Sequence, residues 1–160
     1  KKEYPGLLQN DPDARAEAET LAGRTYELSQ FLVNVLRVTS VETDFRGRVA
    51  YHDSCHLLSG LGEYRSPRTL LHNTAGVEFV ELPGADECCG FGGSFSVRLP
   101  EVSTAILAKK LANVEATGAD CLVACDAGCL LQMDGGLSRK GSRVRAMHLA
   151  QILAGTDGVD

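Results

Sequence analysis

The sequence lacks an excess of positive charge and any long apolar run. Its 160 residues carry a net charge of −5, because 16 lysines and arginines face 21 aspartates and glutamates. Domains that bind nucleic acid concentrate lysine and arginine on one face, and no such cluster is present, so we exclude a nucleic-acid partner. No apolar run approaches the roughly 20 residues that cross a bilayer as a helix, and we therefore expect no transmembrane segment.

The beginning of the sequence lacks a methionine and the pattern of a secretory signal. It reads KKEYPGLL, and we expect residues 1–160 to form a single domain from the C-terminal part of a longer, cytoplasmic protein. Disulfides belong mainly to secreted proteins, whereas cysteines elsewhere more often bind metals or perform redox chemistry. The six cysteines of this chain therefore indicate metal or redox chemistry.

Helical spacing is clearest near the start of the chain. Asn10 or Asp11 is expected to cap a helix that has Pro12 in its first turn and reaches about Leu36. Further helices are predicted after a cap at Ser66, over residues 100–117 and over residues 148–154. The residues that carry the helical spacing in the first helix are Leu21, Thr25, Leu28, Leu32 and Val35.

Four short strands are predicted to alternate with these helices, over residues 47–52, 77–84, 120–124 and 142–148. This alternation predicts an α/β domain with a mostly parallel, Rossmann-like sheet flanked by helices. Right-handed crossovers place the carboxyl ends of parallel strands at one edge, and open α/β sheets bind their ligands at that edge.

Five cysteines follow the predicted strands, and we expect their thiols to meet at the carboxyl edge of the sheet. Cys121 lies inside a strand instead and is expected to be a buried apolar side chain. The five candidate ligands are Cys55 after the first strand, Cys88 and Cys89 after the second, and Cys125 and Cys129 after the third.

Spacing alone leaves four uses of these thiols open. They could be small buried apolar residues, or a structural zinc site, although zinc usually takes four ligands in two close pairs. They could perform thiol–disulfide exchange, although CDAGC has three intervening residues where a thioredoxin-like motif has two. An iron–sulfur cluster is favoured, because clusters accept thiolates from scattered loops and adjacent cysteines can reach different irons.

The glycines in the stretch ECCGFGGSFS support the cluster. Gly90, Gly92 and Gly93 allow backbone conformations and close approaches that other residues do not. Their N–H groups are expected to point at cluster or cysteine sulfur and to offset its negative charge. We therefore expect these three glycines to line the cofactor that the cysteines bind.

The order Cys55, then Cys88-Cys89-Gly90, then Cys125 and Cys129 resembles the CCG cysteine-rich domain. That domain occurs in heterodisulfide reductase, in the iron–sulfur subunit of glycolate oxidase and in lactate-utilisation proteins, usually as two motifs in tandem. The resemblance covers about residues 4–154, and the final C-x-x-x-C is one residue longer than the general C-x-x-C. The segments that are most similar to the lactate-utilisation branch are YHDSCHLLSGLGEYRSPRTLL, ELPGADECCGFGGSFSVRLPEVSTAILAKKL and TGADCLVACDAGCLLQMDGGL.

The resemblance implies an α/β fold and a four-iron, four-sulfur cluster. In heterodisulfide reductase this cluster is of a non-cubane type that uses all five cysteines of a motif, and zinc is the alternative occupant. For the lactate branch the resemblance implies electron transfer during oxidation of L-lactate to pyruvate, in a complex with two partner proteins. A peripheral membrane location through partners is the alternative to a purely cytoplasmic one. The alternatives are a zinc-stabilised assembly domain without catalytic activity, a cluster-based disulfide reductase and a glycolate oxidase iron–sulfur subunit.

Polar residues near the cysteines are assigned structural roles. Asp53 and Asp126 are expected to cap turns by accepting hydrogen bonds from backbone N–H groups. Glu63 is expected to be solvated. For His56 and for His148, a hydrogen-bonded loop histidine is favoured over a metal ligand.

Overall fold

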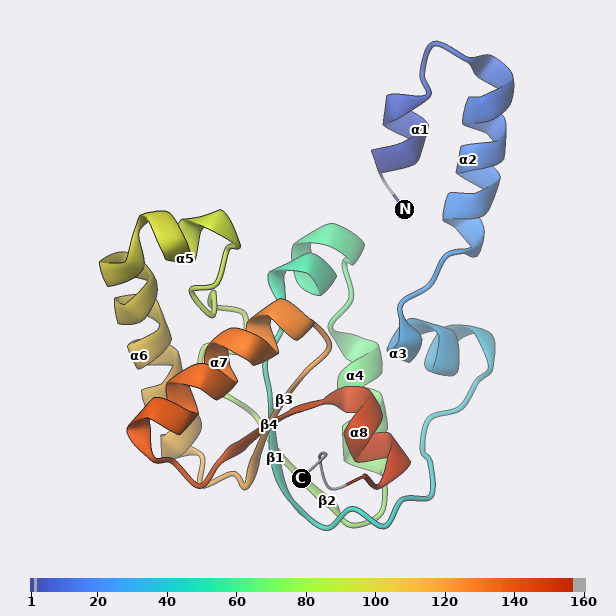
Figure 1. Cartoon of the computed structure of the whole chain (residues 1–160). Helices are drawn as coiled ribbons and strands as arrows, with labels where there is room; N and C mark the ends of the chain where they lie inside the picture. The colour runs from blue at the N-terminus through green and yellow to red at the C-terminus, as the bar shows by residue number, and fades with distance from the viewer. Residues whose placement is uncertain (2, 157–160) are drawn as a thin grey trace.

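Four parallel strands form one sheet in this computed structural model, which describes residue 1 and residues 3–156 (Figure 1). The sheet order is β2-β1-β3-β4, and every neighbouring pair is parallel. The predicted α/β class is therefore confirmed, and each strand lies within its predicted range. The strands are β1 (Gly47–Tyr51), β2 (Val77–Val80), β3 (Cys121–Ala124) and β4 (Arg145–His148).

The helices differ widely in length, and two of them, η1 and η2, are π-helices. None of the helices in the described part of the chain is long and apolar enough to cross a membrane. They are α1 (Glu3–Leu7), α2 (Pro12–Arg24), α3 (Leu28–Gln30), η1 (Phe31–Val35), η2 (His56–Leu61), α4 (Arg65–Asn73), α5 (Ser94–Arg98), α6 (Pro100–Ala116), α7 (Ala127–Lys140) and α8 (Leu149–Ala154).

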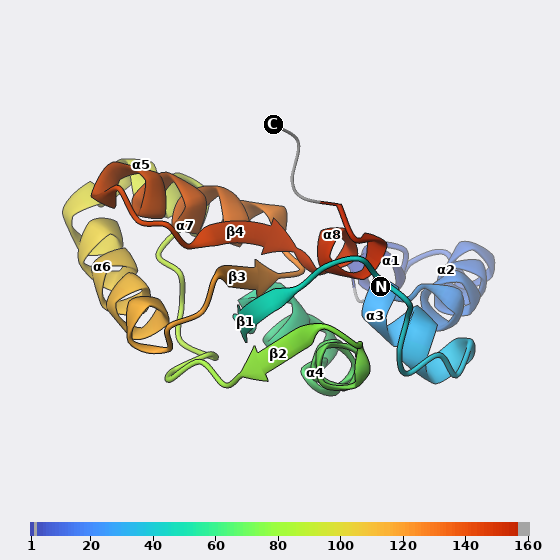
Figure 2. The same cartoon turned by 90° about the horizontal axis from the view of Figure 1, so that it is seen from below.

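Helices cover both faces of the sheet, and each face has its own buried cluster. Alternate residues of a strand point to opposite faces, so Leu122 and Ala124 of β3 pack against α6 and α7, whereas Cys121 and Val123 pack against α4 and α8. Figure 2 shows the sheet between these two layers. Burial on both faces explains why the central strands are almost wholly apolar.

The direction of the chain through the sheet reverses at β1. From β1 the chain moves to one edge of the sheet to form β2, and this connection carries α4 on one face. From β2 it moves in the other direction to form β3 and then β4. These two connections carry α6 and α7 on the opposite face. The switch point therefore lies between the carboxyl ends of β1 and β3, and open α/β sheets bind ligands at such points.

The first long helix is shorter than the sequence predicted. Asp11 does cap α2, accepting a hydrogen bond from the Ala14 amide at 3.1 Å, but the helix ends at Arg24 instead of near Leu36. Thr25 adopts an extended conformation, and Glu27 then starts α3 by a capping box in which its side chain and that of Gln30 bond reciprocally to backbone amides. As a result α1 and α2 form a hairpin that lies apart from the sheet (Figure 1).

The start of α4 also differs from its prediction. The helix begins at Arg65, and Ser66 lies inside it instead of capping it. The carboxylate of Glu63 accepts hydrogen bonds from the amides of Arg65 at 2.8 Å and Ser66 at 2.7 Å, and the residue is only 6% exposed. The prediction of a solvated Glu63 is therefore wrong, because this carboxylate satisfies amides that would otherwise be unpaired at the helix start.

Two adjacent glycines in α7 differ in what surrounds them and give a test of the α6–α7 packing. A Cβ on Gly136 would lie 2.7 Å from Leu111 and 2.8 Å from Leu107, whereas a Cβ on Gly135 would meet nothing nearer than 3.8 Å. We expect Gly136→Ala to lower the free energy of unfolding by about 1–3 kcal/mol through overpacking. Gly135→Ala should raise it by about 0.5–1 kcal/mol, since alanine is the better helix former.

Urea unfolding of the two variants measures this difference. Equal effects of the two substitutions would contradict the close approach of α6 and α7 at Gly136, because both glycines lie in the same helix and have the same intrinsic propensity.

Candidate metal centre

Each of the five predicted ligand cysteines lies in a segment that follows the carboxyl end of a strand. Cys55 directly precedes η2, the adjacent pair lies in the loop between β2 and α5, and Cys125 follows β3 directly. Cys129 lies in the first turn of α7. Cys55 and Cys88 are exposed, Cys125 is partly buried and Cys89 and Cys129 are buried, and none of these five is in a disulfide.

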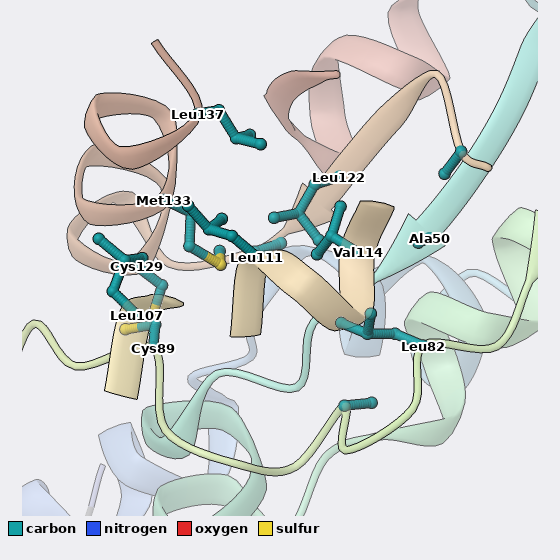
Figure 3. Packing of buried hydrophobic residues seen from close by; sticks show 13 residues of the cluster. Ala50, Leu82, Cys89, Leu107, Leu111, Val114, Leu122, Cys129, Met133 and Leu137 are labelled. Carbon is teal, nitrogen blue, oxygen red and sulfur yellow. The ribbon is translucent and has the colours of Figure 1, made fainter. Parts of the chain in front are cut away.

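Cys89 and Cys129 bring their sulfur atoms together although they are 40 residues apart in the sequence. Their Sγ atoms are 3.2 Å apart, and the residues are only 3% and 4% exposed. Figure 3 shows the two side chains meeting beside Leu107, at the end of the apolar cluster beneath α6 and α7. The loops after β2 and β3 thus deliver two thiols to one buried point.

A hydrogen bond joins the two sulfurs and shifts their pKa values in opposite directions. The hydrogen bond between them lowers the pKa of Cys89, as does the Phe91 amide. The same hydrogen bond, together with burial, raises the pKa of Cys129. Cys89 is therefore the thiolate of the pair, and a thiolate is the form that binds metals.

His52 completes this group, and the sequence analysis gave it no role. It directly follows β1, its amide donates to the Val123 carbonyl at 2.8 Å, and its ring is 1% exposed. One ligand atom from each of His52, Cys89 and Cys129 lies within 4.8 Å of the other two. A histidine directly after the strand that ends at the switch point is the sequence signal that could have identified it.

The glycine-rich loop places a backbone donor on the neighbouring cysteine. The Gly90 amide donates to the Cys88 sulfur at 3.2 Å, and Cys88 itself is exposed. Gly90 has φ +88°, and a Cβ there would lie 2.6 Å from the Ser103 carbonyl oxygen, so only glycine allows the loop to approach α6 this closely. Gly93 has φ 58° and starts α5, and nothing within 4 Å faces its Cβ position.

Cys125 packs against the opposite face of the sheet from Cys129. It continues the alternation of β3, contacts the cluster beneath α4 and α8, and accepts a hydrogen bond from the Tyr51 hydroxyl at 3.6 Å. Burial raises the pKa of the Cys125 thiol to about 12. Asp126 follows Cys125 and caps α7.

Asp126 and His56 join the loops after β1 and β3. Asp126 accepts a hydrogen bond from the Cys129 amide at 2.9 Å and contacts His56 Nδ1 at 3.0 Å. Burial alone would raise the pKa of Asp126, but these two contacts hold it below its usual value. The structure therefore shows the expected capping role for Asp126 and an exposed, hydrogen-bonded histidine at position 56, which is the first residue of η2 and does not lie in a loop.

Asp53 does not cap a turn, contrary to the prediction. Its two carboxylate oxygens accept hydrogen bonds from the guanidinium of Arg68, both at 2.7 Å, and the side chains are 6% and 18% exposed. These hydrogen bonds raise the pKa of Arg68 above its usual value, so that the pair stays ionised. It connects the loop after β1 to α4.

A buried lysine lies beneath the loop that carries the adjacent cysteines. Lys110 is 1% exposed, and its ammonium contacts the carbonyl oxygens of Gly84 and, at 3.5 Å, Ala85. Burial lowers its pKa, whereas the negative charges of Glu87 and Cys89 oppose this shift. Lys110 therefore places positive charge close to the thiolate of Cys89.

The described residues contain one group of three metal-ligating side chains within 4.8 Å, and it consists of His52, Cys89 and Cys129. Cys55, Cys88 and Cys125 lie outside it, so their role as ligands stays a prediction. Cys121 is buried, as expected. His148 caps α8 by accepting a hydrogen bond from the Ala150 amide at 3.1 Å.

Comparison with known families agrees with the positions of these cysteines. A family model described as "CCG: Cysteine-rich domain" matches residues 49–134, which is more than half of the chain. The matched segment extends from β1 into α7 and includes all six cysteines.

Similar proteins share most of this chain. Lactate utilization protein A of Geobacillus thermodenitrificans is 46% identical over 95% of the chain, and those of Lysinibacillus sphaericus and Bacillus subtilis are 44% and 43% identical over the same share. The chain spans 64%, 67% and 64% of these three relatives, which is about two thirds of their length.

Proposed function

The chain belongs to the CCG cysteine-rich domain family, and from this premise we propose that it holds an iron–sulfur cluster and transfers electrons in the oxidation of L-lactate to pyruvate. Its relatives are named lactate utilization protein A, and we extend the role in this name to this chain. The observation that carries the proposal is the meeting of the Cys89 and Cys129 sulfurs, 3.2 Å apart, at the carboxyl edge of the sheet.

The residues at this edge fit a thiolate-bound cluster. Cys89 is held as a thiolate, the Gly90 amide donates to the Cys88 sulfur, and His52 Nε2 is a buried polar atom without a hydrogen-bond partner. Amide donors and positive charge offset the negative charge of a thiolate site. The ammonium of Lys110, which lies beneath the loop that carries the adjacent cysteines, supplies positive charge. The proposed ligands are those expected from the sequence: Cys55, Cys88, Cys89, Cys125 and Cys129, with Gly90, Gly92 and Gly93 lining the cofactor.

The overall reaction removes two electrons and two protons from L-lactate. A cluster bound here would accept and release electrons one at a time. The residues of this chain would hold that group, exclude water from it by the burial of Cys89 and Cys129, and tune it through backbone N–H groups. We propose that the oxidation of lactate itself takes place in partner proteins of the same complex.

Reconstitution of the chain under anaerobic conditions tests the proposal. With ferrous iron and sulfide we expect equal amounts of iron and acid-labile sulfide, about four of each per chain, and an EPR signal upon reduction. That signal should also develop when a lactate-oxidising partner is supplied with L-lactate.

Two results would contradict this function. One zinc per chain without sulfide would favour a non-catalytic assembly domain. A cluster whose spectrum responds to a disulfide substrate, but not to the lactate-reduced partner, would favour a disulfide reductase.

A further inference from the structure

His52 Nε2 is a buried polar atom that has no hydrogen-bond partner. The residue is 1% exposed, so water does not replace the missing partner at its surface. A buried polar group without a partner destabilises the folded state, and native structures seldom retain one without a function. One ring nitrogen of His52 lies within 4.8 Å of the Cys89 and Cys129 sulfurs.

The other ring nitrogen determines the form of the imidazole. His52 Nδ1 lies 3.1 Å from the carbonyl oxygen of Ala85. A carbonyl oxygen only accepts hydrogen bonds, so Nδ1 carries the proton and Nε2 of the neutral ring keeps its lone pair. A histidine that binds a metal usually donates its second nitrogen to a carboxylate or a backbone carbonyl in this way.

The Ala85 carbonyl is itself held in place by two further donors. It accepts from the Asp53 amide at 3.0 Å and contacts the Lys110 ammonium at 3.5 Å. Asp53 adjoins His52 and is fixed by its ion pair with Arg68. The imidazole therefore has a fixed orientation before any ligand arrives.

The distances among the three ligand atoms are close to those required by a single ion. Two sulfurs bound at about 2.3 Å to one tetrahedral ion lie about 3.8 Å apart, and a sulfur and a nitrogen about 3.6 Å apart. The Cys89 and Cys129 sulfurs are 3.2 Å apart, and all three ligand atoms lie within 4.8 Å. A change of about 0.6 Å between the sulfurs and of up to about 1.2 Å between nitrogen and sulfur would complete the geometry.

We infer that His52 Nε2, Cys89 Sγ and Cys129 Sγ form a mixed nitrogen–sulfur binding site for one thiophilic divalent transition-metal ion. Imidazole and thiolate together select such ions over magnesium or calcium, which prefer oxygen ligands. Three protein ligands leave one position of a tetrahedral ion for water or sulfide. The inference deepens the proposed function. The identification of this ion with an iron of the proposed cluster rests on that function.

Titration with Co²⁺ alone tests the site on the complete chain. We expect one Co²⁺ per chain, with thiolate-to-metal charge-transfer absorption and tetrahedral d–d bands. His52→Asn keeps a side-chain amide that can donate to the Ala85 carbonyl, but it removes the atom at Nε2. It should weaken Co²⁺ binding about tenfold or more and shift the d–d bands. His72→Gln is the matched control, because His72 is an exposed histidine on α4 that contacts Phe79, and it should change neither.

A measurement on the unmodified chain guards against a variant that fails to fold. Among the four histidines, exposed His56 also has its Nδ1 against an acceptor, a carboxylate oxygen of Asp126. Long-range ¹H–¹⁵N correlation spectra should therefore show one further histidine, buried His52, with its proton on Nδ1 and protected from exchange with solvent. Adding Zn²⁺ should shift the Nε2 resonance of that histidine alone. Unchanged Nε2 resonances, or the same Co²⁺ affinity and d–d bands in His52→Asn as in the unmodified chain, would overturn the inference.

The inference and the proposed function fail in different ways. If iron and sulfide do not assemble but Co²⁺ binds with the expected dependence on His52, the ion site stands and the electron-transfer function falls. If a cluster assembles normally in His52→Asn and Co²⁺ binding is unaltered, the function stands and His52 is not a ligand.

Discussion

Replacing Cys129 with serine is expected to reduce the iron and sulfide bound after reconstitution to about a tenth or less of the normal amount. The same result is expected for Cys89→Ser. Serine is nearly equal in size to cysteine, but its hydroxyl stays protonated at neutral pH and does not replace a thiolate as a ligand. Because the two sulfurs lie 3.2 Å apart, the loss of either one removes a ligand from the same point.

A cysteine outside the site provides the control. Cys121 is fully buried in β3 and packs against Met147 on the other face of the sheet. Cys121→Ala removes a thiol and creates only a small cavity, so metal loading should remain normal. Iron, sulfide and absorption spectra of the three variants decide the outcome. Full loading of both serine variants would mean that the meeting of Cys89 and Cys129 is merely packing, and the proposed function would lose its main support.

Replacing Arg68 with methionine is expected to lower the free energy of unfolding by about 3–5 kcal/mol, measured by urea denaturation. Methionine keeps most of the apolar stem of arginine but removes the guanidinium that binds both oxygens of Asp53 at 2.7 Å. The Asp53 carboxylate is 6% exposed and would be left without its partner. The loss should shrink at acidic pH, because burial raises the pKa of an unpaired carboxyl and a folded state that binds the proton more tightly gains stability as the pH falls.

Two further variants separate this ion pair from a general effect of losing arginine. Arg15→Met removes an exposed ion pair with Glu19 and should change stability by about 1 kcal/mol or less. Adding Asp53→Asn to Arg68→Met removes the buried charge, so the double variant should be more stable than the sum of the two single losses predicts. An effect of Arg68→Met as small as that of Arg15→Met would show that Asp53 reaches water.

The fold was predictable from the sequence because its signals are local. Short apolar runs alternate with helical segments, and this alternation alone indicates the parallel sheet and its carboxyl edge. The helix predicted to reach Leu36 was wrong because the apolar spacing continues through Thr25, whereas the capping box at Glu27 starts a new helix there. Helix α7 was missed because its Gly135–Gly136 pair resembles a turn, although Gly136 is required by close packing on Leu107 and Leu111.

The site was only partly predictable because its contacts join distant segments. Strand ends place the cysteines at one edge, but the sequence does not show that Cys125 and Cys129 face opposite sides of the sheet. It also does not show that Ala85 fixes the ring of His52, since these residues are 33 positions apart. The roles of Asp53 and Glu63 depend on burial, and periodicity does not report the burial of a single charged residue in a loop.

The deep position of the Cys89 and Cys129 sulfurs constrains when a metal can be acquired during biogenesis. Their loops are separated by 40 residues and meet only after β2 and β3 have joined the sheet. An emerging polypeptide therefore offers no complete site, and in the finished domain the two sulfurs belong to residues that are only 3% and 4% exposed. Maturation of the protein would then be limited by access to these sulfurs as well as by the supply of metal.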